Sequence, residues 1–205
     1  YWWEWGHRQL ARFIGILWLV GFLTLWIRNQ IPERWTFYFL AIGLLGALQA
    51  FLGWWMVSSG LDGQVVDVFS YRLAIHLTMA FIILALIFWA ILFHSENSAA
   101  LFESRRYRNK LSVNILFTLG VLCYLQLALG ALVAGIDAGR GYNDWPLMNG
   151  NWIPDDLLDY KPFITNFFEN PGLVQFNHRV IAYILFVVVS IVWWINRRSP
   201  YSKIR

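Results

Sequence analysis

Charged side chains are scarce in this sequence, and their scarcity excludes an ordinary soluble domain. Asp, Glu, Lys and Arg make up 14% of the 205 residues, whereas hydrophobic residues make up 59%, and the mean hydropathy is +0.50. A soluble domain carries roughly 25% charged residues. Cysteine is scarcer still. Cys123 stands alone inside an apolar run, which excludes an intramolecular disulfide and predicts a small buried apolar side chain.

Long stretches that are poor in charge predict membrane-spanning helices. A helix needs about 20 apolar residues to cross the bilayer core, and five runs reach that length to within a few residues. These runs cover residues 8–27, 35–57, 72–93, 112–136 and 177–195. The sequence therefore predicts an all-α protein, a polytopic membrane helical bundle that crosses a lipid bilayer five times.

The basic residues behind the net charge of +4 concentrate in alternate loops. Lys and Arg gather in 28–34, in 94–111 and in the tail after 195, whereas 58–71 and 137–176 are rich in acidic residues. The positive-inside rule places the basic loops on the cytoplasmic (or matrix) side and the N-terminus outside. The basic residues thus determine topology, and no nucleic-acid partner is predicted.

Three histidines lie at matched depth near the predicted outer face. His7, His76 and His178 fall within roughly the first two turns of three separate spans, at about 1.5 Å per residue. Ionisable groups within a bilayer are costly, which makes them candidates for function. No Cys or carboxylate cluster with zinc-ligand spacing accompanies them, so neutral imidazoles on facing helices favour axial ligation of heme iron. His94, at the inner end of its span, is interpreted as a structural interfacial residue.

Charged residues flank these histidines. Glu4 precedes His7 by three residues and shares its helix face. There a carboxylate suits proton transfer beside a bound heme, or it stabilises a helix N-terminus. Arg8, Arg72 and Arg179 are candidates for forked hydrogen bonds to heme propionates. Snorkelling of these arginines to lipid phosphates is the alternative.

Two short echoes run through the sequence. E-W-G-H-R at 4–8 resembles Q-F-N-H-R at 175–179, and L-Q-A-F-L-G at 48–53 resembles L-Q-L-A-L-G at 125–130. The two copies of the first echo and the two copies of the second are separated by different numbers of residues. The second echo therefore indicates two helices of one type rather than a repeat in a common register. The first predicts a duplicated bundle with sites between facing helices. Because the carboxylate occurs only in the first copy, we expect chemistry in the first half and cofactor holding in the second.

Longer strings resemble a known family. Y-W-W-E-W-G-H-R at 1–8, G-W-W-M-V-S-S-G at 53–60, Y-R-L-A-I-H-L at 71–77, Y-N-D-W-P-L-M-N-G at 142–150 and Q-F-N-H-R at 175–179 are similar to motifs of heme A synthases. The resemblance runs essentially end to end and is closest to the alphaproteobacterial and mitochondrial branch. It implies eight helices in two four-helix halves. Residues 1–111 would be helices 2–4, and residues 112–205 would be helices 5 and 6. We expect the sequence to lack the family's first helix and its last two.

The resemblance also implies a reaction and its participants. Heme A synthases oxidise the C8 methyl group of heme O, in two steps, to the formyl group of heme A for cytochrome c oxidase assembly. By motif, His7 and His76 flank the substrate heme, Glu4 is the catalytic carboxylate, and His178 is an axial ligand of a heme b cofactor. Heme O synthase, oxidase assembly factors and a homo-oligomer are the implied partners. The implied location is the bacterial inner membrane, or the mitochondrial inner membrane in a eukaryote.

Two other functions compete with this one. A diheme cytochrome b-like electron carrier needs the histidines but has no use for Glu4. A transporter needs helices broken by Gly or Pro at mid-membrane. The prolines of this sequence lie in its predicted loops, and no charged residue falls at the middle of a span. The sequence therefore favours a heme protein over a transporter.

Overall fold

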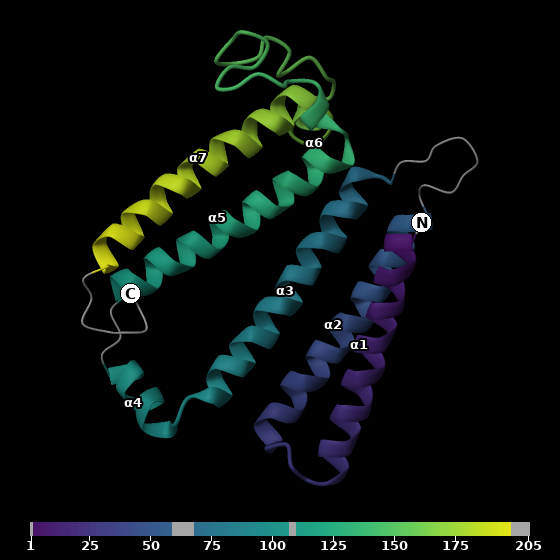
Figure 1. Ribbon diagram of the computed structural model, residues 1–205, viewed down its shortest axis with the longest axis vertical. Coiled ribbons are helices and arrows are strands. Elements are labelled where there is room, and N and C mark those ends of the chain that lie inside the picture. Colours follow the sequence, from purple (N-terminus) through teal and green to yellow (C-terminus); the bar gives the residue numbers. More distant parts are fainter. Residues whose placement is uncertain (1, 59–67, 107–109, 198–205) are drawn as a thin grey trace.

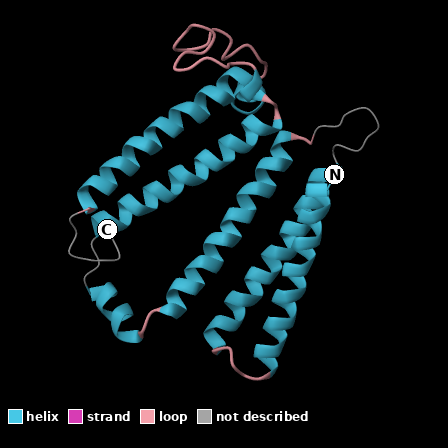
Figure 2. Ribbon diagram, in the orientation of Figure 1, coloured by secondary structure: helices cyan, strands magenta, loops and turns pink. Residues whose placement is uncertain are grey.

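The computed structural model describes residues 2–58, 68–106 and 110–197. Five long helices make up most of the chain (Figure 1). They are α1 (Trp2–Ile27), α2 (Glu33–Ser58), α3 (Ser70–Ser95), α5 (Lys110–Gly135) and α7 (Pro171–Asn196). Each has 26 residues and is long and apolar enough to cross a membrane. At about 1.5 Å per residue such a helix exceeds a bilayer core of about 30 Å. Figure 2 shows no strand among the described residues, and the predicted all-α membrane bundle is confirmed.

The helices extend beyond most of the apolar runs that predicted them. The largest differences are at α1 and α7, each of which begins six residues before its run, α7 at Pro171. Asn170 caps this helix by accepting a hydrogen bond from the backbone nitrogen of Leu173 at 3.0 Å. An Asn cap followed by proline is a common helix start, so the polar first turns belong to the helix. Asn29 and Asp137, with φ of 54° and 53°, follow the ends of α1 and α5.

The helices stand in an open row. α1 packs on α2, α2 on α3, α3 on α5 and α5 on α7. Neighbours in the row run antiparallel (Figure 1), so the first turns of α1, α3 and α7 and the last turns of α2 and α5 lie toward one face. The loop 136–170 lies on that face too. The three histidines near these first turns are therefore on the same side of the protein.

Small residues let neighbouring helices approach closely. A Cβ added to Gly43 on α2 would lie 2.0 Å from the Trp18 ring on α1, and one added to Gly135 on α5 would lie 2.6 Å from the Ser70 backbone on α3. Close approach at glycine is the usual way in which membrane helices pack. The contact at Gly135 fixes the distance between α3 and α5 at the outer face. This contact also joins the two predicted halves, whose boundary after residue 111 stays a prediction.

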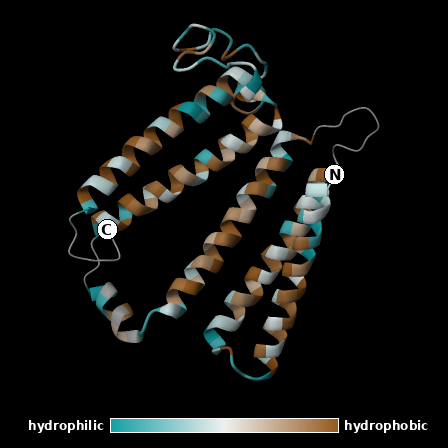
Figure 3. Cartoon of the chain, viewed as in Figure 1, coloured by the Kyte–Doolittle hydropathy of each residue, from teal (hydrophilic) through white to brown (hydrophobic). Residues whose placement is uncertain are grey.

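Hydrophobic residues predominate along the long helices (Figure 3), and many of their large apolar side chains are exposed, as expected where lipid surrounds the protein. Cys123 lies on one of these helices, α5. The structure shows it exposed, so the prediction of a buried cysteine was wrong. The physical reason is that an apolar run in a membrane helix does not distinguish a helix-facing position from a lipid-facing one.

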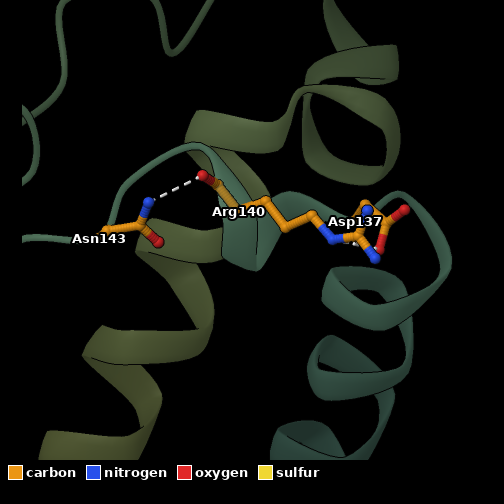
Figure 4. Close-up of polar contacts among 3 residues, drawn as sticks. All are labelled: Asp137, Arg140 and Asn143. Carbon is orange, nitrogen blue, oxygen red and sulfur yellow. Dashed lines mark hydrogen bonds and ion pairs between the residues drawn. The ribbon is translucent and has the colours of Figure 1, made fainter.

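Shorter helical segments lie in the loops. They are α4 (Ser98–Arg106), η1 (Ala138–Arg140), η2 (Phe163–Thr165) and α6 (Asn166–Glu169). Where the chain leaves α5, Arg140 bridges the turn (Figure 4): its Nε lies 3.4 Å from Asp137 Oδ1, and its carbonyl accepts a hydrogen bond from Asn143 Nδ2 at 3.0 Å. This turn directs the chain into the outer loop, 136–170.

Candidate functional site

The His76 side chain, on α3, packs against α2. His76 is the seventh residue of α3 and half-buried. Gln49 on α2 donates a hydrogen bond from its amide nitrogen to the His76 carbonyl at 2.9 Å, and the same nitrogen lies 3.5 Å from His76 Nε2. One turn along α2, a Cβ added to Gly53 would lie 2.8 Å from His76 Cε1. The imidazole thus lies directly against the backbone of α2, with an amide at one edge.

His178 has the same surroundings in the second half. It is the eighth residue of α7 and half-buried. The amide nitrogen of Gln126 on α5 lies 3.2 Å from His178 Nε2. A Cβ added to Gly130 would lie 3.1 Å from His178 Cε1. The L-Q-x-x-L-G echo, which we expected to report only a helix type, therefore places a glutamine and a glycine against a histidine twice.

A cavity of about 340 Å³ opens beside His178, between α3, α5 and α7. Its polar lining consists of His178 and Gln126, and its other walls include Leu73, Leu77 and Gly130. A mainly apolar cavity with a few polar groups is the usual form of a cofactor site. The imidazole is therefore accessible to a ligand that enters among these three helices.

The residues present fit a heme. His76 Nδ1 and His178 Nδ1 are buried and have no hydrogen-bond partner among the residues that the structure describes, and the same holds for the side-chain oxygens of Gln49 and Gln126. Neutral imidazoles in an apolar setting suit axial coordination of heme iron. Within the described ranges, no three residues among His, Cys, Asp and Glu gather as a cage for a bare metal ion.

His7 and Glu4 lie on α1, across α2 from His76. His7 is the sixth residue of α1 and exposed. The Glu4 carboxylate pairs with Arg8 at 3.5 Å, and both side chains are about half exposed. The structure thus places Glu4, His7 and Arg8 together at the outer end of α1. Their catalytic, ligand and propionate roles stay predictions.

The two other arginines that we predicted as propionate partners bind backbone carbonyls. Arg72 donates to the Trp55 carbonyl at 2.7 Å and lies over the Trp55 ring, 4.4 Å from its centroid. Arg179 donates to three carbonyls of the outer loop, those of Tyr142, Asp144 and Leu147, at 2.8–3.0 Å. Three of its five N–H groups are thereby used. The arginine-propionate assignment stays a prediction.

The two copies of the first echo have different contacts. Gln175, at the position that Glu4 holds in the first copy, is buried and donates to the Tyr142 carbonyl at 3.0 Å. Arg179, the counterpart of Arg8, donates to that same carbonyl. In the second half, therefore, both polar neighbours of the histidine secure the outer loop. In the first half, Glu4 and Arg8 pair with each other.

The outer loop is held by buried polar side chains. Asn166, fully buried, bonds the backbone of Tyr160 and Phe163 at 2.9 Å. Asp144 accepts hydrogen bonds from the backbone nitrogens of Gly150 and Asn149, which lower the pKa of its carboxyl. Tyr71 at the start of α3 donates to Glu169, which ties the loop to the first half. Hydrogen-bond networks of this kind favour one conformation of a loop.

The alkaline stability of this loop is expected to depend on Tyr142. Burial, and then its hydrogen bond to Asp156, raise the pKa of Tyr142 from 10.0 to about 12. The stabilising contribution is complete below pH 10 and is lost as the pH rises through about 12, because the folded protein disfavours the phenolate. Thermal melts between pH 8 and pH 12 should fall less steeply for Tyr142→Phe. The exposed Tyr160→Phe is the control, and equal slopes for all three proteins would contradict the assignment.

Comparison with known proteins agrees with the motifs. Residues 1–205 match the family model described as cytochrome oxidase assembly protein (COX15-CtaA). The heme A synthase of Dinoroseobacter shibae is 50% identical over 98% of this chain. Those of Roseobacter denitrificans and Paracoccus denitrificans are each 48% identical over 100% of it. The chain spans about half the length of these curated relatives, 52% to 54%. No solved structure matches. The resemblance seen in the sequence is confirmed, and the chain belongs to the cytochrome oxidase assembly protein family.

Proposed function

We propose that the protein acts as a heme A synthase, oxidising the C8 methyl group of heme O to the formyl group of heme A. The observation that carries the proposal is the identity of about half of all residues, over essentially the whole chain, to proteins named heme A synthase. The imidazoles of His76 and His178 support it, because each lies beside a glutamine amide on a neighbouring helix and a mainly apolar cavity opens beside His178.

The proposed residue roles are those that the family motifs imply. His7 and His76 hold the substrate heme, and His178 holds a heme b, which supplies electron transfer when bound. Converting a methyl group to a formyl group with one water releases four protons and four electrons. Glu4, one helical turn from His7, is the carboxylate that accepts protons at this end of α1. Its partner Arg8 restrains its position.

The setting of the reaction is a membrane. The five long apolar helices and the bacterial relatives indicate a membrane protein, and we place it in the inner membrane with the histidines near the outer face. Heme O synthase, as the source of substrate, and cytochrome c oxidase assembly factors, as recipients of product, are the proposed partners. A homo-oligomer is compatible with the open row of helices.

Replacing Glu4 by Gln tests the enzyme against an electron carrier. The protein is expressed from the complete gene, and its hemes are extracted and quantified. We expect heme A to fall by about 10²-fold or more, the usual loss when an acid–base group is removed, while total heme stays unchanged. Glu33→Gln, an exposed acid in the first turn of α2, is the matched control. Normal heme A with normal heme content would remove the catalytic role of Glu4 and favour the diheme electron carrier.

A further inference from the structure

The glutamine and the glycine beside each histidine hold the same positions relative to the end of their helix. Gln49 stands nine residues before Ser58, the last residue of α2, and Gln126 stands nine residues before Gly135, the last residue of α5. The glycine follows each glutamine by four residues and so lies on the same helix face. Two helices with different positions in the chain thus present the same pair of residues at the same depth.

The hydrogen bonds of Gln49 determine which atom faces the ring. Its amide nitrogen donates to the His76 carbonyl, so the nitrogen, and not the oxygen, faces His76 Nε2. An N–H donor requires an acceptor, so Nε2 carries the lone pair and Nδ1 carries the proton. The Gln126 amide nitrogen lies 3.2 Å from His178 Nε2, and by correspondence with Gln49 we assign the same tautomer to His178. In a neutral imidazole the contact at one nitrogen decides the tautomer.

The glycines determine where the ring can lie. A real Cβ essentially never approaches another atom within 3.0 Å, and a methyl group on Gly53 would lie 2.8 Å from His76 Cε1. The corresponding distance at Gly130 is 3.1 Å, which the ring could accommodate by moving a few tenths of an ångström. The His76 imidazole therefore occupies space that exists because residue 53 is glycine, and the His178 imidazole would have to shift slightly to admit a Cβ at residue 130.

We propose that Gln49 with Gly53, and Gln126 with Gly130, are two copies of one imidazole cradle that positions His76 and His178 for axial ligation. The glycine gives the ring its place against the helix backbone. In the heme-free protein the amide selects the tautomer in which Nε2 holds a lone pair, and the amide would have to move away from Nε2 for that atom to coordinate iron. All four are positioning residues, and the inference rests on the proposed heme-binding roles of the two histidines.

The first test uses protein prepared without heme. The ring nitrogens of ¹⁵N-histidine-labelled protein in lipid vesicles are observed by solid-state NMR and assigned by replacing each histidine in turn. We expect His178 Nε2 to be unprotonated, and its resonance to move toward that of a protonated nitrogen in Gln126→Leu, with His94 unchanged. Gln49→Leu should do the same for His76. A protonated Nε2 in the parent protein, or a resonance insensitive to the glutamine, would overturn the tautomer assignment.

The second test uses the heme-loaded protein from the complete gene. Gly53→Ala and Gly130→Ala are compared with Gly46→Ala and Gly120→Ala, which lie on the same two helices and have nothing within 4 Å of an added Cβ. We expect the cradle variants to lower heme affinity by about 10–100-fold, as loss of a ligand-orienting contact does. The largest g value of the remaining low-spin heme should shift, and the effect should be greater at Gly53.

The outcomes separate the two proposals. Helical content from circular dichroism shows which variants fold, and the NMR measurement on the glutamine variants does not depend on heme. A parent protein that binds no heme would overturn the proposed function, and the ligation role of the cradles with it. A parent that binds heme, with folded cradle variants whose affinity and g values equal those of the two control variants, would overturn the cradles alone.

Discussion

Replacing His178 by Ala is expected to abolish the low-spin heme b spectrum of the protein expressed from its complete gene. His178 is one of two polar side chains that line the cavity between α3, α5 and α7. Its Nδ1 is buried without a hydrogen-bond partner among the described residues, and its Nε2 lies 3.2 Å from the Gln126 amide nitrogen. If this imidazole is the axial ligand, its removal leaves a mainly apolar cavity whose other polar side chain, Gln126, is a carboxamide and does not replace it. Reduced-minus-oxidised absorption spectra of the purified protein measure the loss.

The matched control for this prediction is His94→Ala. His94 is the histidine that we interpret as structural, and its ring lies 4.4 Å from that of Trp35 at the inner end of α3. Its removal should leave the heme spectrum unchanged. If His178→Ala retained the parent spectrum, or if His94→Ala lost it, the ligand assignment on α7 would be wrong.

Replacing Arg179 by Leu is expected to release the outer loop from α7. The guanidinium bonds the carbonyls of Tyr142, Asp144 and Leu147, and α7 carries it one residue after His178. A hydrogen bond to a charged donor contributes about 1.5–3 kcal/mol. Because the arginine is only half-buried, we expect a total loss of about 3 kcal/mol in the free energy of unfolding. Limited proteolysis should then cleave within 142–156, a segment that we expect to resist cleavage in the parent protein.

This experiment also separates the two interpretations of Arg179. The three loop contacts join atoms of the polypeptide itself, so a loop role predicts the same proteolytic sensitivity in heme-free protein. A role confined to propionate binding predicts sensitivity only in the loaded protein. Arg12→Leu is the control, because Arg12 is exposed on α1 and contacts Gln9 one turn away. A loop equally protected in Arg179→Leu and Arg12→Leu would show that the three carbonyl bonds do not hold it.

The sequence difference between the two halves, Glu4 in the first and Gln175 in the second, has a structural reason. Glu4 and Arg8 pair on an exposed helix end, whereas Gln175 and Arg179 both bind the Tyr142 carbonyl. A glutamate at 175 would carry no N–H to donate to that carbonyl, so the second copy needs an amide. We propose catalysis in the first half and cofactor binding in the second. This difference coincides with a structural one, because the first turns of α7 hold the outer loop, whereas Glu4 and Arg8 on α1 pair with each other.

Much of this protein follows from its sequence alone. Apolar runs predicted all five helices, since a bilayer requires a helix of sufficient length and hydrophobicity whatever surrounds it. The common depth of His7, His76 and His178 also followed, because the rise per residue converts a position in a run into a depth. The motifs led to the family. These properties depend on residues that are close together in the chain.

The tertiary structure decided which residues meet. The sequence showed the L-Q-x-x-L-G echo, but not that Gln49 contacts His76 and Gln126 contacts His178, 27 and 52 residues away. Nor did it show that Cys123 is exposed, or that Arg179 binds three loop carbonyls. In a membrane every face of a helix is apolar, so hydrophobic periodicity does not indicate which face packs against a neighbour. Only the packing of one helix on another determines that face, and with it the surroundings of each histidine.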